Sequence, residues 1–167
     1  MPTAHRVSII LCLSCCLLGS GLAATAIQTT AVPLAERARG AELVVVGRVA
    51  SVAPGWQVNE FGDRLIVSVV RVVVNETLKG QALATLDVEV EGGTIGEVTL
   101  HVSDETSFSP GERGVFYLRR TPRGTFVPHL RGDGLLKLDA SNRVAGSSLT
   151  LEEIRREAAA GAVGNVR

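Results

Sequence analysis

The sequence predicts a mainly β domain, either a small antiparallel barrel or a β-sandwich, with a short helix at its start and another at its end. Short runs rich in Val and Leu recur along the chain, and several of them alternate with polar residues. Turns that contain Gly or Pro separate these runs at regular spacing. Six or seven short strands with such turns are typical of all-β architectures.

The first 26 residues have the pattern of a secretory signal peptide. His5 and Arg6 precede an apolar run over residues 7–18, and a stretch of small residues ends in Ala24-Thr25-Ala26. The run is shorter than the about 20 apolar residues that a spanning helix needs. We therefore predict cleavage after Ala26, export to the periplasm or the medium, and no transmembrane segment after processing. The alternatives are an uncleaved anchor and a lipidated cysteine.

All three cysteines, Cys12, Cys15 and Cys16, lie inside this leader segment. They therefore give no evidence for a zinc or redox site. Residues 27–167 contain no thiol and are expected to form one domain that folds by its core alone, without disulfides.

The individual elements follow from local patterns. Pro33 and Gly40 are placed as the first-turn proline and terminal glycine of a short helix. Residues 54–63 are rich in turn formers and are predicted to form the longest loop of the core. The expected elements, in order, are a helix over 33–39, strands over 43–52, 65–74, 86–91, 98–102, 115–118, 125–127 and 135–138, and a helix over 151–160.

The last helix has the clearest start and stop signals. Thr150 and Glu153 have the spacing of a capping box, and Leu149 and Ile154 occupy the positions of a hydrophobic staple. Gly161 is predicted to end the helix.

A hairpin register follows from alternation in the middle of the chain. Leu86, Val88 and Val90 are predicted to share one face with Val98, Leu100 and Val102. Directly paired residues face the same side, so this register places Asp87 opposite His101 across a loop over 92–96.

Composition excludes several functions. The 17 basic and 17 acidic residues cancel, and only 4% of residues are aromatic, which argues against a nucleic-acid partner. Glycine patterns for nucleotide binding and the G-x-S-x-G nucleophile motif are absent from the sequence, and no cofactor is expected.

Two groups of residues are candidates for binding a partner. Trp56 and Phe61 lie in the predicted loop, where large aromatic side chains often anchor other proteins. Arg119, Arg120 and Arg123 lie on one predicted basic hairpin, which suits an acidic partner; the alternative is a solvated loop.

A third candidate is a shallow metal site. Asp87 and Glu89 belong to a carboxylate row, and the predicted register adds His101 as a nitrogen ligand. A solvated strand face with a single ion pair is the favoured interpretation of the same three residues, so we assign no metal.

Several landmarks resemble those of a group of exported bacterial β-barrel domains without a settled function. The matching segments are residues 41–49, 72–80, 92–93, 108–113, 115–118 and 149–156. More distantly, their order is similar to that of netrin-like domains, including the tissue inhibitors of metalloproteinases, which are OB-type barrels. That resemblance implies an OB-like barrel. Those inhibitors present an N-terminal cysteine to the protease zinc, and residues 27–167 have none, so it does not imply their chemistry.

The sequence thus favours a non-catalytic exported module that binds another envelope or extracellular protein. The alternative is an envelope enzyme or enzyme inhibitor that uses the face formed by Asp87, Glu89 and His101.

Overall fold

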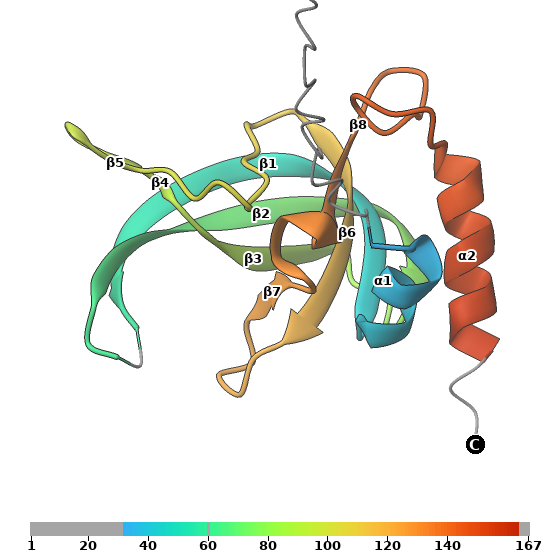
Figure 1. Cartoon of the computed structure of the whole chain (residues 1–167), viewed down its shortest axis with the longest axis horizontal. Helices are drawn as coiled ribbons and strands as arrows, with labels where there is room; N and C mark the ends of the chain where they lie inside the picture. Colours follow the sequence, from blue (N-terminus) through green and yellow to red (C-terminus); the bar gives the residue numbers. More distant parts are fainter. Residues whose placement is uncertain (1–31, 60, 164–167) are drawn as a thin grey trace, which may run out of the picture. The chain divides into compact units, whose positions relative to one another are not determined.

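The computed structural model describes residues 32–59 and 61–163 (Figure 1). The predicted signal peptide lies outside these residues. The elements are α1 (Leu34–Gly40), β1 (Leu43–Val58), β2 (Arg64–Lys79), β3 (Thr85–Glu91), β4 (Gly93–Ile95), β5 (Val98–Leu100), β6 (Arg113–Arg120), β7 (Phe126–Pro128), the 3-10 helix η1 (Arg131–Gly134), β8 (Leu135–Leu138) and α2 (Leu151–Val163).

The prediction of a mainly β domain is confirmed. Six strands form one sheet in the order β1-β2-β3-β7-β6-β8, and β1 pairs with β6 as well. All these pairs are antiparallel except β3 with β7, which are parallel at Val88 and Phe126. β4 and β5 form a separate two-stranded sheet.

The first half of β1 separates two hydrophobic clusters. Val45 and Val49 belong to the cluster inside the curved sheet, together with Val88 and Phe116. Val44 and Val46 point to the opposite face and pack in the second cluster, which contains residues of both α1 and α2. Because both faces are covered, this stretch of β1 is apolar without alternation.

The predicted loop over 54–63 is wrong in its extent. β1 continues through Pro54 and Trp56 to Val58, and β2 begins at Arg64, so the turn contains only residues 59–63. The Asn59 side-chain oxygen accepts hydrogen bonds from the backbone N–H groups of Phe61 and Asp63, at 3.0 and 2.8 Å. The result is a long hairpin arm, defined as residues 51–58 of β1 with 64–71 of β2, in which residues 67–71 also pair with β3.

The predicted hairpin register is also wrong. Gly93 pairs with Leu100 and Ile95 pairs with Val98, with a two-residue turn between Ile95 and Val98. Gly92 and Gly93 both have positive φ, so the chain bends there, and β4 leaves the sheet that contains β3. As a consequence Val98 is 51% exposed and does not share the inner face with Val88.

The terminal helix begins where the capping box predicts. The backbone N–H of Thr150 donates to Glu153 Oε2 at 2.8 Å, and the backbone N–H of Glu153 donates to Thr150 Oγ1 at 3.3 Å. Leu151, Ile154 and Ala158 are buried. The helix runs past Gly161 to Val163, so the predicted end, and the range 151–160, are too short. None of the helices in the described part of the chain is long and apolar enough to span a membrane.

Candidate functional site

A groove lies where the arm, β3 and the turn between β6 and β7 meet. Its volume is about 180 Å³. Leu65, Val67 and Val127 provide apolar surface, while Glu89 and Arg123 provide charge. Its remaining lining residues are Gln57, Val58, Asn59 and Glu91. Apolar surface with a few charged groups is the usual composition of a site for another molecule.

The carboxylate row of β3 is paired with arginines. Arg71 holds Asp87 with two hydrogen bonds of 2.8 Å, which lower the pKa of the Asp87 carboxyl. The ion pair between Arg123 and Glu89 is 3.4 Å long and lies in the groove. Glu91 is paired with Arg131 at 3.0 Å. Pairing with three arginines explains why a strand face can carry three consecutive acidic positions.

The candidate metal ligands Asp87, Glu89 and His101 do not come together. Asp87 lies opposite Arg71 of β2, and His101 follows β5 in the other sheet. Within residues 32–59 and 61–163, no group of three His, Asp or Glu side chains has the geometry to hold a metal ion. The proposed ion pair of Asp87 with His101 is therefore wrong, because the bend at Gly92 and Gly93 separates the two strands.

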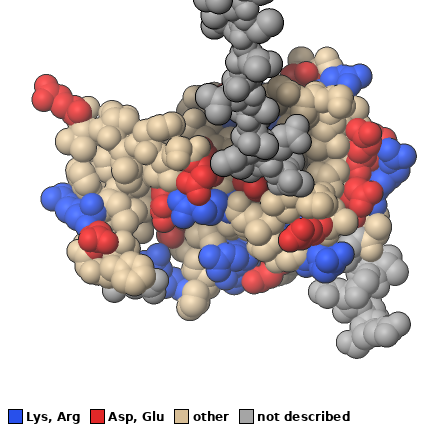
Figure 2. Space-filling model, viewed as in Figure 1, with Lys and Arg blue, Asp and Glu red and all other residues tan. Residues whose placement is uncertain are grey.

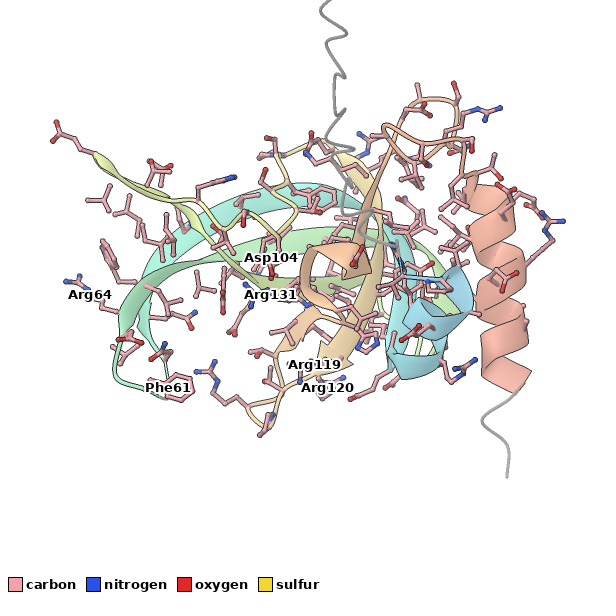
Figure 3. The ribbon with its side chains drawn as sticks, in the orientation of Figure 1. Phe61, Arg64, Asp104, Arg119, Arg120 and Arg131 are labelled. Carbon is pink, nitrogen blue, oxygen red and sulfur yellow. The ribbon has the colours of Figure 1, made fainter. Side chains whose placement is uncertain are left out.

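The two aromatic candidates lie at the end of the arm and in its turn, where Figure 3 shows Phe61 and Arg64. Trp56 belongs to β1 and is 40% exposed, and the Arg64 guanidinium lies 4.3 Å from its ring centroid. Phe61 is in the turn at the end of the arm and is 81% exposed. Both side chains are therefore exposed at the surface, Phe61 freely and Trp56 with one ring face covered by Arg64.

Only one of the three candidate arginines lines the groove. Arg123 does so through its ion pair with Glu89. Arg120 stacks over the Phe126 ring, with 4.4 Å between the guanidinium carbon and the ring centroid, and donates to the Gly124 carbonyl. Arg119 is exposed on β6. Positive and negative side chains are interspersed on the face shown in Figure 2, which does not form a continuous basic patch.

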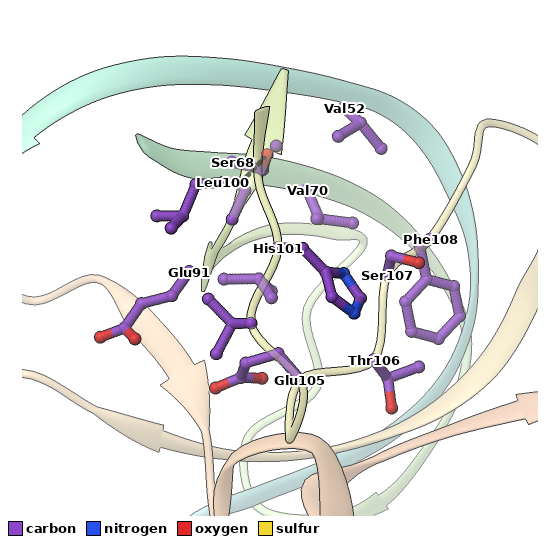
Figure 4. Close-up of a pocket in the computed structure, with 14 residues that line it drawn as sticks. Val52, Ser68, Val70, Glu91, Leu100, His101, Glu105, Thr106, Ser107 and Phe108 are labelled. Carbon is purple, nitrogen blue, oxygen red and sulfur yellow. Dashed lines mark hydrogen bonds between the residues drawn. The ribbon is translucent and has the colours of Figure 1, made fainter. Parts of the chain in front are cut away.

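A second cavity, of about 130 Å³, lies between the segment over 100–108 and the surface formed by β1, β2 and β3 (Figure 4). His101 lines this cavity, as do Ser68, Glu91, Glu105 and Thr106. The apolar residues around it are Val52, Val70, Val90, Leu100, Val102 and Phe108.

The Glu105 side chain, which no sequence motif singles out, is only 7% exposed. One of its oxygens is 3.5 Å from Arg131 Nε. The other, Oε2, is buried and has no hydrogen-bond partner among the described residues. Burial raises the pKa of this carboxyl, and the nearby Arg131 charge partly offsets the increase.

Comparison with known proteins adds no functional assignment. No protein-family model matches the chain, and no similar sequence is found among curated proteins.

Proposed function

We propose that residues 27–167 form an exported, non-catalytic module that binds an extended segment of another envelope or extracellular protein in the groove. The export step rests on the signal-peptide pattern of the first 26 residues. The binding step rests on the position and chemistry of the groove.

We further propose that the sheet is an OB-type barrel, related to the exported group and to netrin-like domains. Three observations support this architecture. The strand pairs run from β1 through β2, β3, β7 and β6 and return to β1. The pairing of β3 with β7 is parallel, while the others in this series are antiparallel. Alternate β1 residues face an enclosed apolar cluster.

The position of the groove is the observation that carries the proposed function. OB folds bind ligands on the face of their second and third strands and on the loops joining strands one to two and four to five. The corresponding parts of this chain are β2, β3, the turn over 59–63 and the turn between β6 and β7. The groove is lined by residues from these strands and turns, among them Leu65, Glu89 and Arg123.

Its chemistry favours a protein segment over a polyanion. Glu89 and Glu91 place two carboxylates beside the single Arg123 guanidinium, which disfavours a phosphate backbone. The one tryptophan of the chain is already stacked under Arg64. The apolar floor, by contrast, suits the side chains of a peptide, and a mixed-charge rim suits its polar groups.

Site-directed photo-crosslinking of the full chain tests this function. A photoreactive residue at Val58, which is 65% exposed in the groove, is expected to crosslink one defined envelope protein. The same group at Ala140, an exposed position lining a different cavity, is the control. Peptides from the captured protein are then titrated against the wild type, Arg123→Ala and Arg119→Ala.

Arg123→Ala is expected to weaken peptide binding about tenfold, the effect of one charge-assisted contact. Arg119→Ala removes an equal charge from the same hairpin outside the groove and should leave the affinity unchanged. Equal crosslinking at positions 58 and 140, or equal effects of the two arginine variants, contradicts the proposal.

A further inference from the structure

Two arginines lie directly opposite each other on neighbouring strands. Arg48 of β1 pairs with Arg113 of β6, and the next pair on the same face is Val46 with Val115, both in the second hydrophobic cluster. Directly opposite residues have Cβ atoms about 5 Å apart, and like charges in such a pair destabilise a sheet. A negative charge between the two guanidinium groups would therefore stabilise this pair.

No carboxylate supplies that charge among residues 32–59 and 61–163. The ion pairs between these residues involve neither Arg48 nor Arg113. Neutral oxygens hold both guanidinium groups instead. Arg48 Nη1 donates to the Gly111 carbonyl at 2.5 Å, and Arg113 Nη2 donates to Asn142 Oδ1 at 2.9 Å. Because a guanidinium has five N–H donors, both arginines retain donors for a ligand.

The turn after β8 holds the acceptor that orients Arg113. Asp139 Oδ1 accepts hydrogen bonds from the backbone N–H groups of Ser141 and Arg143, at 2.8 and 2.9 Å. The backbone N–H of Asn142 donates to the Asp139 carbonyl at 3.2 Å. Asn142 has a positive φ of 60°, which asparagine tolerates better than most residues. The Asn142 amide is therefore positioned by the turn itself, before any ligand binds.

Arg48 and Arg113 both line a cavity of about 540 Å³, which lies within the roughly 300–1,000 Å³ of small-molecule sites. The other charged residues of its wall are Lys137, Glu112 and Asp139. Lys137 and Glu112 neutralise each other in an ion pair of 3.0 Å. Three positive and two negative side chains leave one positive charge in excess, and the arginines carry it. The cavity therefore attracts an anion.

The phosphate group of a phosphomonoester fits this arrangement better than a carboxylate does. It has a charge of about −1.5 to −2 at neutral pH and three acceptor oxygens, whereas a carboxylate has one charge and two oxygens. Guanidinium groups bind phosphate through two parallel N–H···O bonds. Arg48 and Arg113 start from adjacent positions and have long side chains, so both can donate to one phosphate group.

We propose that this cavity binds the phosphate group of a phosphomonoester between Arg48 and Arg113. The group belongs either to a free small molecule or to a phosphorylated headgroup at a membrane surface. Leu138, Ala140 and Ala145 provide apolar surface for the rest of the molecule. The cavity shares no lining residue with the groove, so this inference does not depend on the function proposed for the groove.

Calorimetric titration of the full chain with glycerol 3-phosphate tests the proposal, and glycerate serves as a carboxylate of similar size. At about pH 8 the ester is a dianion, because its second pKa is about 6. At matched ionic strength the wild type should bind the ester at least about tenfold more tightly than glycerate, since one further hydrogen bond between charged groups is worth that factor. Equal affinity for the two ligands overturns the proposal.

Flotation with vesicles distinguishes the two sources of the phosphate group. The vesicles contain phosphatidylcholine alone, or with phosphatidic acid, a phosphomonoester, or with phosphatidylglycerol, a phosphodiester. Extra retention on phosphatidic acid that Arg48→Gln abolishes indicates a headgroup, and binding of the soluble ester without such retention indicates a free molecule. Equal retention on the two anionic lipids overturns the proposal. So does a lack of such retention together with no binding of the ester up to roughly 10 mM.

Arg48→Gln and Arg113→Gln should each weaken binding of the ester about tenfold. Arg119→Gln removes an exposed arginine from the same strand as Arg113, outside the cavity, and should leave the affinity unchanged. Asp139→Asn, which keeps an acceptor oxygen and removes a negative charge from the wall, should strengthen binding. Equal losses of affinity in the three arginine variants indicate a general effect of charge and overturn the proposal.

Thermal unfolding separates a binding role of Arg48 from a structural one. Without ligand, Arg48→Gln should melt no lower than the wild type, because the substitution removes a like-charge contact. The ester should raise the melting temperature of the wild type and not that of Arg48→Gln. If one variant does not fold, the other variant and the comparison of ester with glycerate still decide. An equal rise in the wild type and in both folded arginine variants contradicts the site.

Discussion

Gly47 of β1 lies directly opposite Gly114 of β6, and neither position has room for a side chain. A Cβ at Gly47 would lie 2.9 Å from the Val73 carbonyl oxygen and would overlap the Val72 side chain. At Gly114 it would meet the Leu136 carbonyl and the Phe108 ring, both at 2.9 Å. Gly47 thus lets β2 lie close against β1, and Gly114 lets β8 and Phe108 lie close against β6, because neither glycine has this atom.

Gly47→Ala is expected to lower the free energy of unfolding by about 1–3 kcal/mol, the usual cost of overpacking. Gly55→Ala is a matched control on the same strand, since its Cβ would have no atom closer than 4.0 Å. That control should be neutral or slightly stabilising. Urea denaturation measures the free energy of unfolding of both variants. Equal effects of the two substitutions would show that β2 does not pack tightly against Gly47.

Tyr117 is fully buried on β6, and its hydroxyl has no partner among the described residues. Tyr117→Phe removes this unpaired polar group. The free energy of unfolding should therefore stay the same or rise, by about 3 kcal/mol at most. Burial raises the pKa of Tyr117 to about 12. Because it is the only tyrosine of the chain, an absorbance titration should show a single transition near that pH. A transition near pH 10, or a large loss of stability in the variant, contradicts this account.

Glu105→Gln should change how stability depends on pH. The folded-state pKa of Glu105 is raised above its ordinary value, so the folded protein holds this proton more strongly than the unfolded chain. Stability contributed by this group is therefore present at low pH and falls as the pH rises through the folded pKa. The variant should gain on the wild type at neutral pH and lose that advantage in acid. Thermal melts of both proteins across the acidic range measure this, and a difference in melting temperature that stays constant with pH would contradict it.

Arg37 connects α1 to η1. It is 6% exposed and donates hydrogen bonds to the carbonyls of Val32 and Asp133, at 2.9 and 2.6 Å, and to the Asp133 carboxylate at 3.1 Å. Arg37→Ala should therefore destabilise the fold by about 1–3 kcal/mol. Arg39→Ala removes an exposed arginine two residues further along the same helix and should change stability by less than about 0.5 kcal/mol. Equal melting temperatures for the two variants would argue against this connection.

Local patterns predicted the elements whose structure depends on neighbouring residues. The capping box at Thr150 and Glu153 forms because its two hydrogen bonds join residues three positions apart. The alternation of Leu86, Val88 and Val90 likewise fixes which face of β3 is buried. These features need no information from distant parts of the chain.

Distant pairings explain the errors. Pro54 and Gly55 suggested a loop, yet this part of β1 pairs only with β2 in the described residues, and a strand edge tolerates a proline that lacks a donor. The site around Glu105 depends on Arg131, which is brought to it by the chain between β6 and η1. No periodicity links positions so far apart, so the contact of Glu105 with Arg131 could not be predicted from the sequence.

At the end of the arm, residues 56–58 pair with 64–66 and with no third strand among the described residues, so the length of this end can change without altering the rest of the sheet. From Ser51 to Val58, β1 keeps a continuous register with β2 alone, whereas its first residues are held between β2 and β6. Removing the same number of residues from both strands beside the turn preserves the remaining cross-strand pairs, and removing two from each also keeps the turn residues facing the same side. Related chains can therefore extend or shorten this arm in such steps, changing how far Phe61 projects while leaving the hydrophobic clusters intact.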